Sequence, residues 1–134
     1  MVRRIFTIGE TVYDIIFKDG VPIAAKAGGS TLNSSVSLGR LGLPVHFISE
    51  IGKDQVGNQI VNFLEENNVS IDYLQLFEKG RTAIALAFLD KYQDATYSFY
   101  HNYPNKRLQG EFPEVKENDI VLFGSYFAIS KETR

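Results

Sequence analysis

The sequence predicts an α/β fold: a parallel β-sheet with helices, into which a second, small β-sheet is inserted. Two observations predict the parallel sheet. Short apolar stretches typical of buried strands alternate with stretches of helical periodicity, and the joints between them are short. Such an order requires parallel pairing and right-handed crossovers. The small sheet is predicted by a third observation, a change to period-2 alternation after the second helix.

The composition fits one globular domain and excludes several classes of function. Of 134 residues, 44% are apolar and 22% charged, and the formal net charge is −2. No cluster of Lys and Arg exceeds two neighbours, which argues against a nucleic-acid partner. There is no cysteine, and His46 and His101 lack metal-ligand spacing, so we expect no metal site. Because Glu10 and Asp14 interrupt the first apolar stretch, we expect no membrane segment there and a soluble, cytoplasmic protein.

The N-terminal part of the chain predicts three strands. Residues 4–9 have the pattern of a short buried strand that ends at a glycine, and residues 12–17 that of a second strand. An Asp-Gly turn then leads into residues 21–26, which we expect at a sheet edge because Pro22 cannot donate a backbone hydrogen bond. The first of these strands begins the parallel sheet.

The loop before the first predicted helix contains more glycine and polar residues than a turn and a helix cap require. Gly28 and Gly29 precede a helix over about residues 31–41, and Ser30 or Thr31 is expected to cap it. Glycine lets a backbone approach a ligand closely, and a helix N-terminus offers unpaired N–H groups. A tight turn that needs positive φ is the alternative interpretation of the glycine pair.

Two polar residues strengthen the ligand hypothesis. Asn33 lies in the first helical turn, where a cap would not need its amide, although a spare capping residue is the alternative. Asp14 stands between apolar neighbours in a predicted strand, so its carboxylate must be paired, exposed at an edge or bound to a ligand. An ionised carboxylate only accepts hydrogen bonds and suits two adjacent sugar hydroxyls. These residues predict a polar small-molecule site near residues 28–33.

The second helix continues the parallel layer. It follows a predicted strand over residues 45–52, and Asp54 has the place of its N-cap, which explains that aspartate without a catalytic role. Apolar residues recur within it at helical spacing. Asn67 and Asn68 can end the helix in a left-handed conformation, and the sequence pattern changes after residues 73–77.

The inserted sheet is predicted by two strands, residues 82–90 and 95–103, with a polar turn where they join. In the second strand, Phe99 and His101 share one face, because side chains alternate along a strand. Residues 118–130 then predict another buried strand that runs into a loop. We expect the inserted sheet to roof the polar site.

The motifs resemble those of one family. The stretch AGGSTLNSSVSLGRLGLPVHFISEIGKDQVGNQIVNFLEENNV is similar to the N-terminal signature of the ribokinase-like (phosphofructokinase B-type) sugar kinases. IGETVYDIIF resembles the family's opening strand with its sugar-binding aspartate, and TAIALAFLDKYQDATYSFYHN resembles two strands of its β-sheet lid. Within the family, YSFYHN followed by VLFGSYFAIS is most similar to the bacterial fructokinases.

This resemblance implies a Rossmann-like parallel sheet with helices on both faces and a small β-sheet lid. The lid comprises about residues 12–26 and 82–103, and the α/β core about residues 3–10, 28–77 and 118–134. The family's Gly-Ala-Gly-Asp run has no match here, so we expect only the N-terminal part of a kinase, with no catalytic residue and an open apolar sheet edge. The sites for ATP and Mg²⁺ are expected mostly outside this chain, which alone would be inactive.

The resemblance also implies an activity, the ATP-dependent phosphorylation of a sugar hydroxyl. The residues that it assigns to sugar binding are Asp14, Gly28, Gly29, Asn33, Phe99 and His101. Fructose is the first candidate, but many fructokinase-like members carry arginine at the position of His101, so another small sugar, a nucleoside or a keto-deoxy acid is an alternative. A non-catalytic sugar-binding module is the rival of another class; an oxidoreductase is disfavoured because G-x-G-x-x-G is absent. The lid is a candidate homodimer surface.

Overall fold

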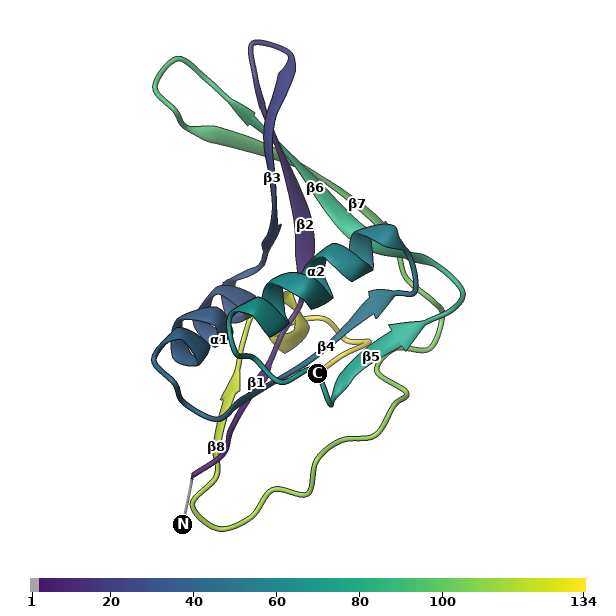
Figure 1. Ribbon diagram of the computed structural model, residues 1–134. Coiled ribbons are helices and arrows are strands. Elements are labelled where there is room, and N and C mark those ends of the chain that lie inside the picture. The colour runs from purple at the N-terminus through teal and green to yellow at the C-terminus, as the bar shows by residue number, and fades with distance from the viewer. Residues whose placement is uncertain (1–2) are drawn as a thin grey trace.

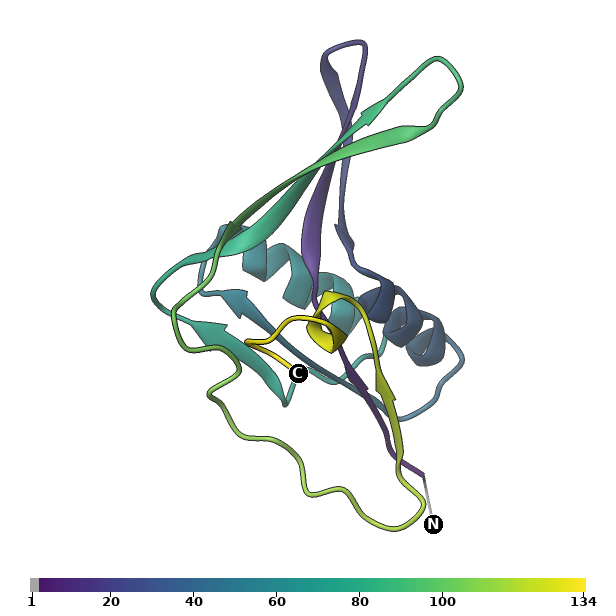
Figure 2. The same ribbon diagram turned by 180° about the vertical axis from the view of Figure 1, so that it is seen from behind.

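The computed structural model describes residues 3–134 as two four-stranded sheets connected through the same chain (Figure 1). The parallel sheet has the order β5-β4-β1-β8, with β1 (Ile5–Ile8), β4 (Val45–Gly52), β5 (Leu74–Phe77) and β8 (Ile120–Phe123). The second sheet has the order β3-β2-β6-β7, with β2 (Val12–Lys18), β3 (Val21–Gly28), β6 (Arg81–Leu89) and β7 (Ala95–Asn102). It projects as a lid from the end of β1 (Figures 1 and 2). The predicted α/β fold with an inserted small sheet is confirmed.

Both α-helices pack on the same face of the parallel sheet, whereas we expected helices on both faces. Side chains of α1 (Ser30–Arg40) and α2 (Gln55–Glu66) share one apolar core with Val45 and Phe47 of β4. On the opposite face the 3₁₀ turn η1 (Tyr126–Ala128) lies over the sheet, while the segment between β7 and β8 passes beside β5 on its way to β8 (Figure 2). Prolines at 104 and 113 interrupt that segment, which forms no helix.

The ends of the two helices agree with the sequence-based predictions at their C-termini, but not at the N-terminus of α1. Asn68 has φ of 60° after α2, so the expected left-handed end of that helix is confirmed, and Gly42, just after α1, also has positive φ, 78°. The expected hydroxyl cap of α1 is wrong: the helix begins at Ser30, and its N-cap is Gly29, which has no side chain to accept a hydrogen bond. The Thr31 hydroxyl lies instead against Gly9 at the end of β1.

β8 is an edge strand rather than the buried strand that we expected. It pairs with β1 on one side, and Ile120, Val121, Leu122 and Phe123 are each 41–47% exposed. The parallel sheet of the described part therefore presents an apolar edge, as expected. An unpaired apolar edge is a surface on which another strand or chain can pair.

Asp54 joins α2 to the base of the lid. Its carboxylate accepts hydrogen bonds from Gly57 N at 2.7 Å, Thr82 N at 2.9 Å and Thr82 Oγ1 at 2.7 Å, which confirms the predicted cap. Burial alone would raise the pKa of the Asp54 carboxyl, but the hydrogen bonds from Thr82 and Gly57 lower it. The hydrogen bonds to Asp54 are therefore strongest when its carboxyl group is ionised.

Asp54→Ala is expected to lower the free energy of unfolding by about 1–2 kcal/mol at neutral pH, the usual range for a lost cap. Because the folded-state pKa is lowered, the contribution is complete above the carboxyl's ordinary pKa and is lost as the pH falls through the folded value. The difference between variant and wild type should therefore shrink near pH 3. Urea unfolding at both pH values measures this, and an equal difference at both would contradict it.

Candidate functional site

A groove of about 580 Å³ lies where the lid sheet meets the N-terminus of α1. Its walls come from β2, β3, β6 and β7 of the lid and from the first turn of α1. Among the lining residues are Asp14, Gly28, Gly29, Asn33 and Phe99. The fold thus brings all the predicted site residues except His101 to one surface, although they come from distant parts of the chain. Their role in binding stays a prediction.

Asp14 lies in the interior of the lid sheet, not at an edge. β2 is paired on both sides, so Asp14 stands beside Lys26 of β3 and Ala85 of β6. Within residues 3–134 its carboxylate forms no ion pair. Burial raises the pKa of the Asp14 carboxyl, and the positive charge of Lys26 acts in the opposite direction. A half-buried carboxylate that faces a groove is an acceptor available to hydroxyl groups of a ligand.

The two glycines are required by contacts within the protein. A Cβ on Gly28 would lie 2.2 Å from Asp14 Oδ2, so only glycine lets the carboxylate occupy its place. Gly29 has φ of 113°, and a Cβ there would lie 2.6 Å from the carbonyl oxygen of Glu10. The alternative interpretation, a turn with positive φ, is therefore correct for Gly29. Both residues nevertheless line the groove.

Aromatic side chains form the lid wall of the groove. Phe99 is 57% exposed and stacks on Tyr97, with ring centroids 5.9 Å apart. Tyr97 lines the groove as well, and the sequence-based assignment missed it. The signal was present, because period-2 alternation places Tyr97 and Phe99 on the same face. Across the groove stands Asn33, an exposed amide in the first turn of α1.

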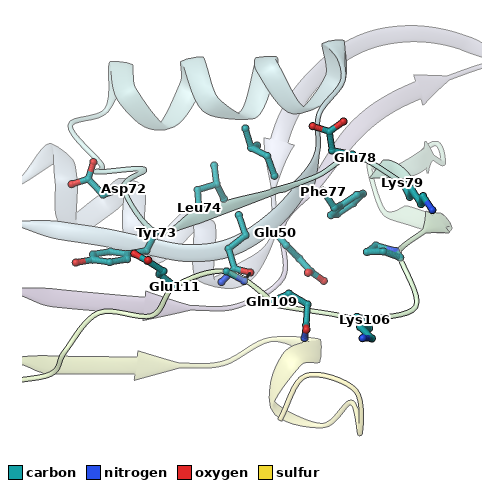
Figure 3. Close-up of a pocket in the computed structure, with 14 residues that line it drawn as sticks. Glu50, Asp72, Tyr73, Leu74, Phe77, Glu78, Lys79, Lys106, Gln109 and Glu111 are labelled. Carbon is teal, nitrogen blue, oxygen red and sulfur yellow. Dashed lines mark hydrogen bonds between the residues drawn. The ribbon is translucent and has the colours of Figure 1, made fainter.

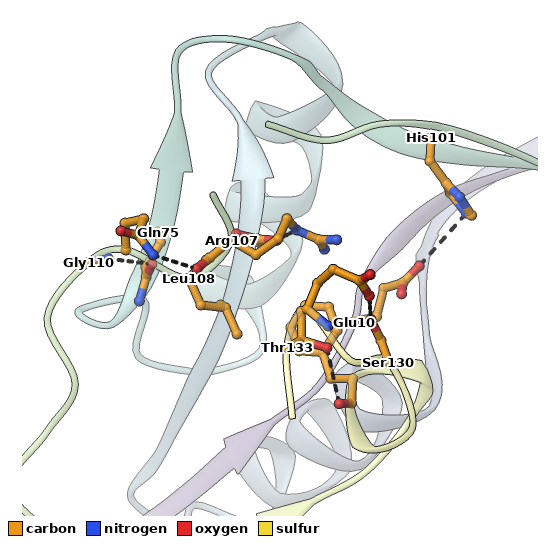
Figure 4. Close-up of polar contacts among 12 residues, drawn as sticks. Glu10, Gln75, His101, Arg107, Leu108, Gly110, Ser130 and Thr133 are labelled. Atoms are coloured by element: carbon orange, nitrogen blue, oxygen red, sulfur yellow. Dashed lines mark hydrogen bonds and ion pairs between the residues drawn. The ribbon is translucent and has the colours of Figure 1, made fainter. Parts of the chain in front are cut away.

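His101 lies beyond the groove and faces Glu10 (Figure 4). Its Nε2 is 4.0 Å from Glu10 Oε1, and the two side chains are 44% and 12% exposed. Its ring stacks on Tyr103, with a centroid separation of 5.5 Å. Burial and the nearby Glu10 charge raise the pKa of the Tyr103 hydroxyl, which therefore stays protonated. Glu10 also donates its backbone N–H to Ser125 Oγ at 2.7 Å, so it joins β1, β7 and the segment after β8.

A second cavity, of about 530 Å³, lies between β5 and the segment after β7 (Figure 3). Side chains of both charges surround it, among them Asp72, Glu78, Glu111, Lys79 and Lys106. None of the residues predicted from the sequence lines it. We therefore place the candidate site in the groove beneath the lid.

The described residues contain neither a metal-binding cluster nor a membrane-spanning helix. Among residues 3–134, no three side chains of His, Asp or Glu come together in a way that would hold a metal ion. No helix in this part of the chain has the length and apolar character needed to cross a membrane.

Known proteins resemble this chain in sequence and in fold. The chain is 31% identical to fructokinase-2 of Zea mays, over 80% of this chain and 33% of that protein. It is 24% identical to the 2-dehydro-3-deoxygluconokinase of Haemophilus influenzae, over 96% of this chain and 45% of that protein. Among solved structures, a fructokinase with bound ATP from Xylella fastidiosa matches with a TM-score of 0.64 at 26% identity, over 75% of this chain and 33% of that one. The chain spans less than half the length of these relatives.

The family follows from a match along almost the whole sequence. The profile of the family described as pfkB family carbohydrate kinase matches residues 2–134. That match includes the glycine pair and the first helix, which build the groove, and both hairpins of the lid. The fold, the groove and the relatives agree with it. The chain belongs to the pfkB family of carbohydrate kinases.

Proposed function

We propose that this protein is a sugar kinase that transfers the γ-phosphoryl group of ATP to a sugar hydroxyl, acting in the cytoplasm, where ATP is available. Fructose is the first candidate. The observation that carries the proposal is the convergence of Asp14, Gly28, Gly29, Asn33 and Phe99 on one groove beneath the lid. The names of the Zea mays and Xylella fastidiosa relatives support fructose. The Haemophilus influenzae relative supports the alternative, a keto-deoxy acid.

In this proposal the groove binds and orients the sugar. Asp14 accepts hydrogen bonds from two hydroxyls, and the Asn33 amide both donates and accepts. Phe99 and Tyr97 pack against the apolar face of the sugar ring, and the lid keeps water from the reacting hydroxyl. Orientation of this kind supplies much of the rate in phosphoryl transfer, which needs little covalent chemistry from the protein.

The catalytic base and the sites for ATP and Mg²⁺ are not assigned to residues of this chain. The carboxylates among residues 3–134 form no metal-binding group, and the sequence contains no Gly-Ala-Gly-Asp run. In-line transfer needs a base, donors to the γ-phosphate and a metal ion. We therefore propose that residues 1–134 alone do not transfer phosphate.

The proposal is tested by a coupled assay of ADP release with fructose, ribose and a keto-deoxy acid. The protein encoded by the complete gene is compared with residues 1–134 alone. Sugar-dependent turnover at about 1–10³ s⁻¹ is expected from the former only. The same turnover by a homogeneous 134-residue chain would contradict the assignment of catalysis to other residues. Sugar binding without any turnover by the complete protein would favour the non-catalytic module.

His101→Arg is expected to change the preference among sugars more than the maximal rate. The ring lies beside Phe99, with centroids 6.2 Å apart, and within residues 3–134 its one acidic partner is Glu10 at 4.0 Å. A guanidinium there adds a permanent charge and a planar set of hydrogen-bond donors, so the ratios of kcat/KM among fructose, ribose and the keto-deoxy acid should change by about tenfold. Steady-state kinetics on the three sugars, with His101→Gln as the uncharged control, measures this. Equal ratios in all three proteins would refute a role in specificity.

We also propose that the lid sheet is the contact surface of a homodimer. Its strands expose apolar and aromatic side chains, including Val21, Ile23, Phe88 and Tyr100, each 42–57% exposed. An apolar surface of this kind on a projecting sheet is typical of association surfaces. Light scattering of the purified protein should give twice the monomer mass. A monomer at all accessible concentrations would contradict the proposal.

A further inference from the structure

A buried ion pair connects the segment after the lid to the parallel sheet. Arg107 Nε donates a hydrogen bond to Glu50 Oε1, and the backbone N–H of Leu108 donates to Glu50 Oε2 at 2.8 Å. The side chains of Arg107 and Glu50 are only 10% and 3% exposed. Glu50 lies near the end of β4, and the two residues are 57 positions apart in the sequence. The pair therefore fixes where the chain goes after it leaves the lid.

A row of rings connects this pair to the groove. The Arg107 guanidinium lies over the Tyr103 ring, 3.6 Å from its centroid. From Tyr103 the row continues along the lid strand β7 through His101 and Phe99 to Tyr97, with neighbouring centroids 5.5, 6.2 and 5.9 Å apart. Phe99 and Tyr97 line the groove, whereas Arg107 does not. Arg107 is thus in indirect contact with the groove wall.

The free energy lost on desolvation of the Arg107–Glu50 pair indicates that its role is positional. A buried ion pair loses the hydration of two charges, so its net contribution to stability is small. The pair nevertheless forms only when the two side chains lie at a restricted distance and orientation. A second aromatic ring lies near the Arg107 guanidinium, since the ring centroid of Phe127 in η1 is 5.7 Å away. The guanidinium is held in place from both the lid and the core. We therefore expect the pair to determine the position of the chain segment after β7 more than the stability of the fold.

We propose that Arg107 and Glu50 are positioning residues that set the place of the lid wall over the groove, acting through the ring row of Tyr103, His101, Phe99 and Tyr97. Neither residue of the pair touches the proposed sugar. The kinetic part of the proposal rests on the proposed function. The structural part does not, because it concerns the mobility of β7 in the protein without sugar.

The first experiment measures hydrogen exchange in β6 and β7 of the protein encoded by the complete gene, without sugar. Arg107→Gln is expected to speed exchange in these strands about three- to tenfold, because local opening depends on local contacts. The matched control is Arg4→Gln, which breaks the Arg4–Asp119 pair between β1 and the start of β8, away from the lid. It should leave β6 and β7 unchanged. An equal increase in α1, or none in β7, would overturn the proposal.

Two substitutions of Tyr103 test the row without breaking the ion pair. Tyr103→Phe keeps the ring and should exchange like the wild type in β7, whereas Tyr103→Leu removes it and should behave like Arg107→Gln. These variants also serve if Arg107→Gln fails to fold, since Glu50 then keeps its partner. Identical hydrogen exchange in the Tyr103→Phe and Tyr103→Leu variants would show that the Tyr103 ring does not affect the mobility of β7, and would contradict the proposal.

Kinetics then separates positioning from stability. In Arg107→Gln and Tyr103→Leu, kcat/KM for the sugar should fall about tenfold or more through a misplaced groove wall, with KM for ATP unchanged. Arg107→Lys, which keeps the charge but not the planar fork, should restore part of the loss. Unchanged sugar kinetics beside faster exchange would overturn the kinetic part. If the wild type phosphorylates no sugar, the proposed function fails, and the exchange experiment still decides the structural part.

Discussion

Asp14→Asn, in the protein encoded by the complete gene, is expected to lower kcat/KM for the sugar about 10²-fold or more and to leave KM for ATP unchanged. Hydrogen bonds to a charged group contribute roughly 1.5–3 kcal/mol each, and the proposed geometry gives Asp14 two of them. The substitution keeps the size of the side chain, so the close contact with Gly28 is preserved. Steady-state kinetics with varied sugar at fixed ATP measures the effect.

The control for this variant is Asp19→Asn. Asp19 is an exposed carboxylate in the turn between β2 and β3, outside the groove, and asparagine tolerates its φ of 50°. The chemical change is the same, so kcat/KM should stay at the wild-type value. If Asp14→Asn changes kcat/KM no more than this control does, Asp14 is an ordinary strand carboxylate and the proposed sugar site is wrong.

Gly29→Ala is expected to lower the free energy of unfolding by roughly 2–5 kcal/mol, through strain and overpacking together. The backbone at Gly29 has φ of 113°, which L-residues rarely adopt. The added Cβ would also lie 2.6 Å from the carbonyl oxygen of Glu10, a backbone atom held in turn by the hydrogen bond between Glu10 N and Ser125 Oγ. Relief of this contact would move the start of α1. Denaturant unfolding of the purified protein measures the loss.

Gly20→Ala separates the two causes. Gly20 also has positive φ, 74°, but no atom of the described residues 3–134 lies within 4 Å of the added Cβ. Only the conformational strain remains there, about 1–2 kcal/mol. A loss at Gly29 no larger than that at Gly20 would mean that the protein has room beside Glu10, and Gly29 would then have no packing explanation.

Much of the fold was predictable because its signals are local. β4 begins and ends where the apolar stretch does, at Val45 and Gly52, and Asp54 caps α2 as its place before the helix indicated. Period-2 alternation predicted the lid strand that became β7, with Tyr97, Phe99 and His101 on one face, and their rings do follow one another there. These features depend on neighbours within a few residues, which a sequence displays directly.

The candidate site was proposed from the sequence for a different reason, and its role stays a prediction. Asp14, Gly28, Gly29 and Asn33 belong to motifs whose order resembles a family, and the structure brings them to one groove. The sequence offered positive φ as a reason for the glycines, but it did not indicate which contacts exclude a side chain there. Gly28 makes room for the Asp14 carboxylate and Gly29 for the carbonyl of Glu10, contacts that exist only after the lid hairpin has formed.

The class of fold, most of its helices and strands and the chain segment that carries the candidate site could be predicted from the residues alone. Three features could not: both helices cover one face, β8 is an exposed edge, and His101 faces Glu10 instead of the groove. The pairing of Arg107 with Glu50, 57 residues away, is of the same kind. The physical reason is that such contacts depend on how whole elements pack. Residue spacing within an element carries no information about the surface that another element will bring to it.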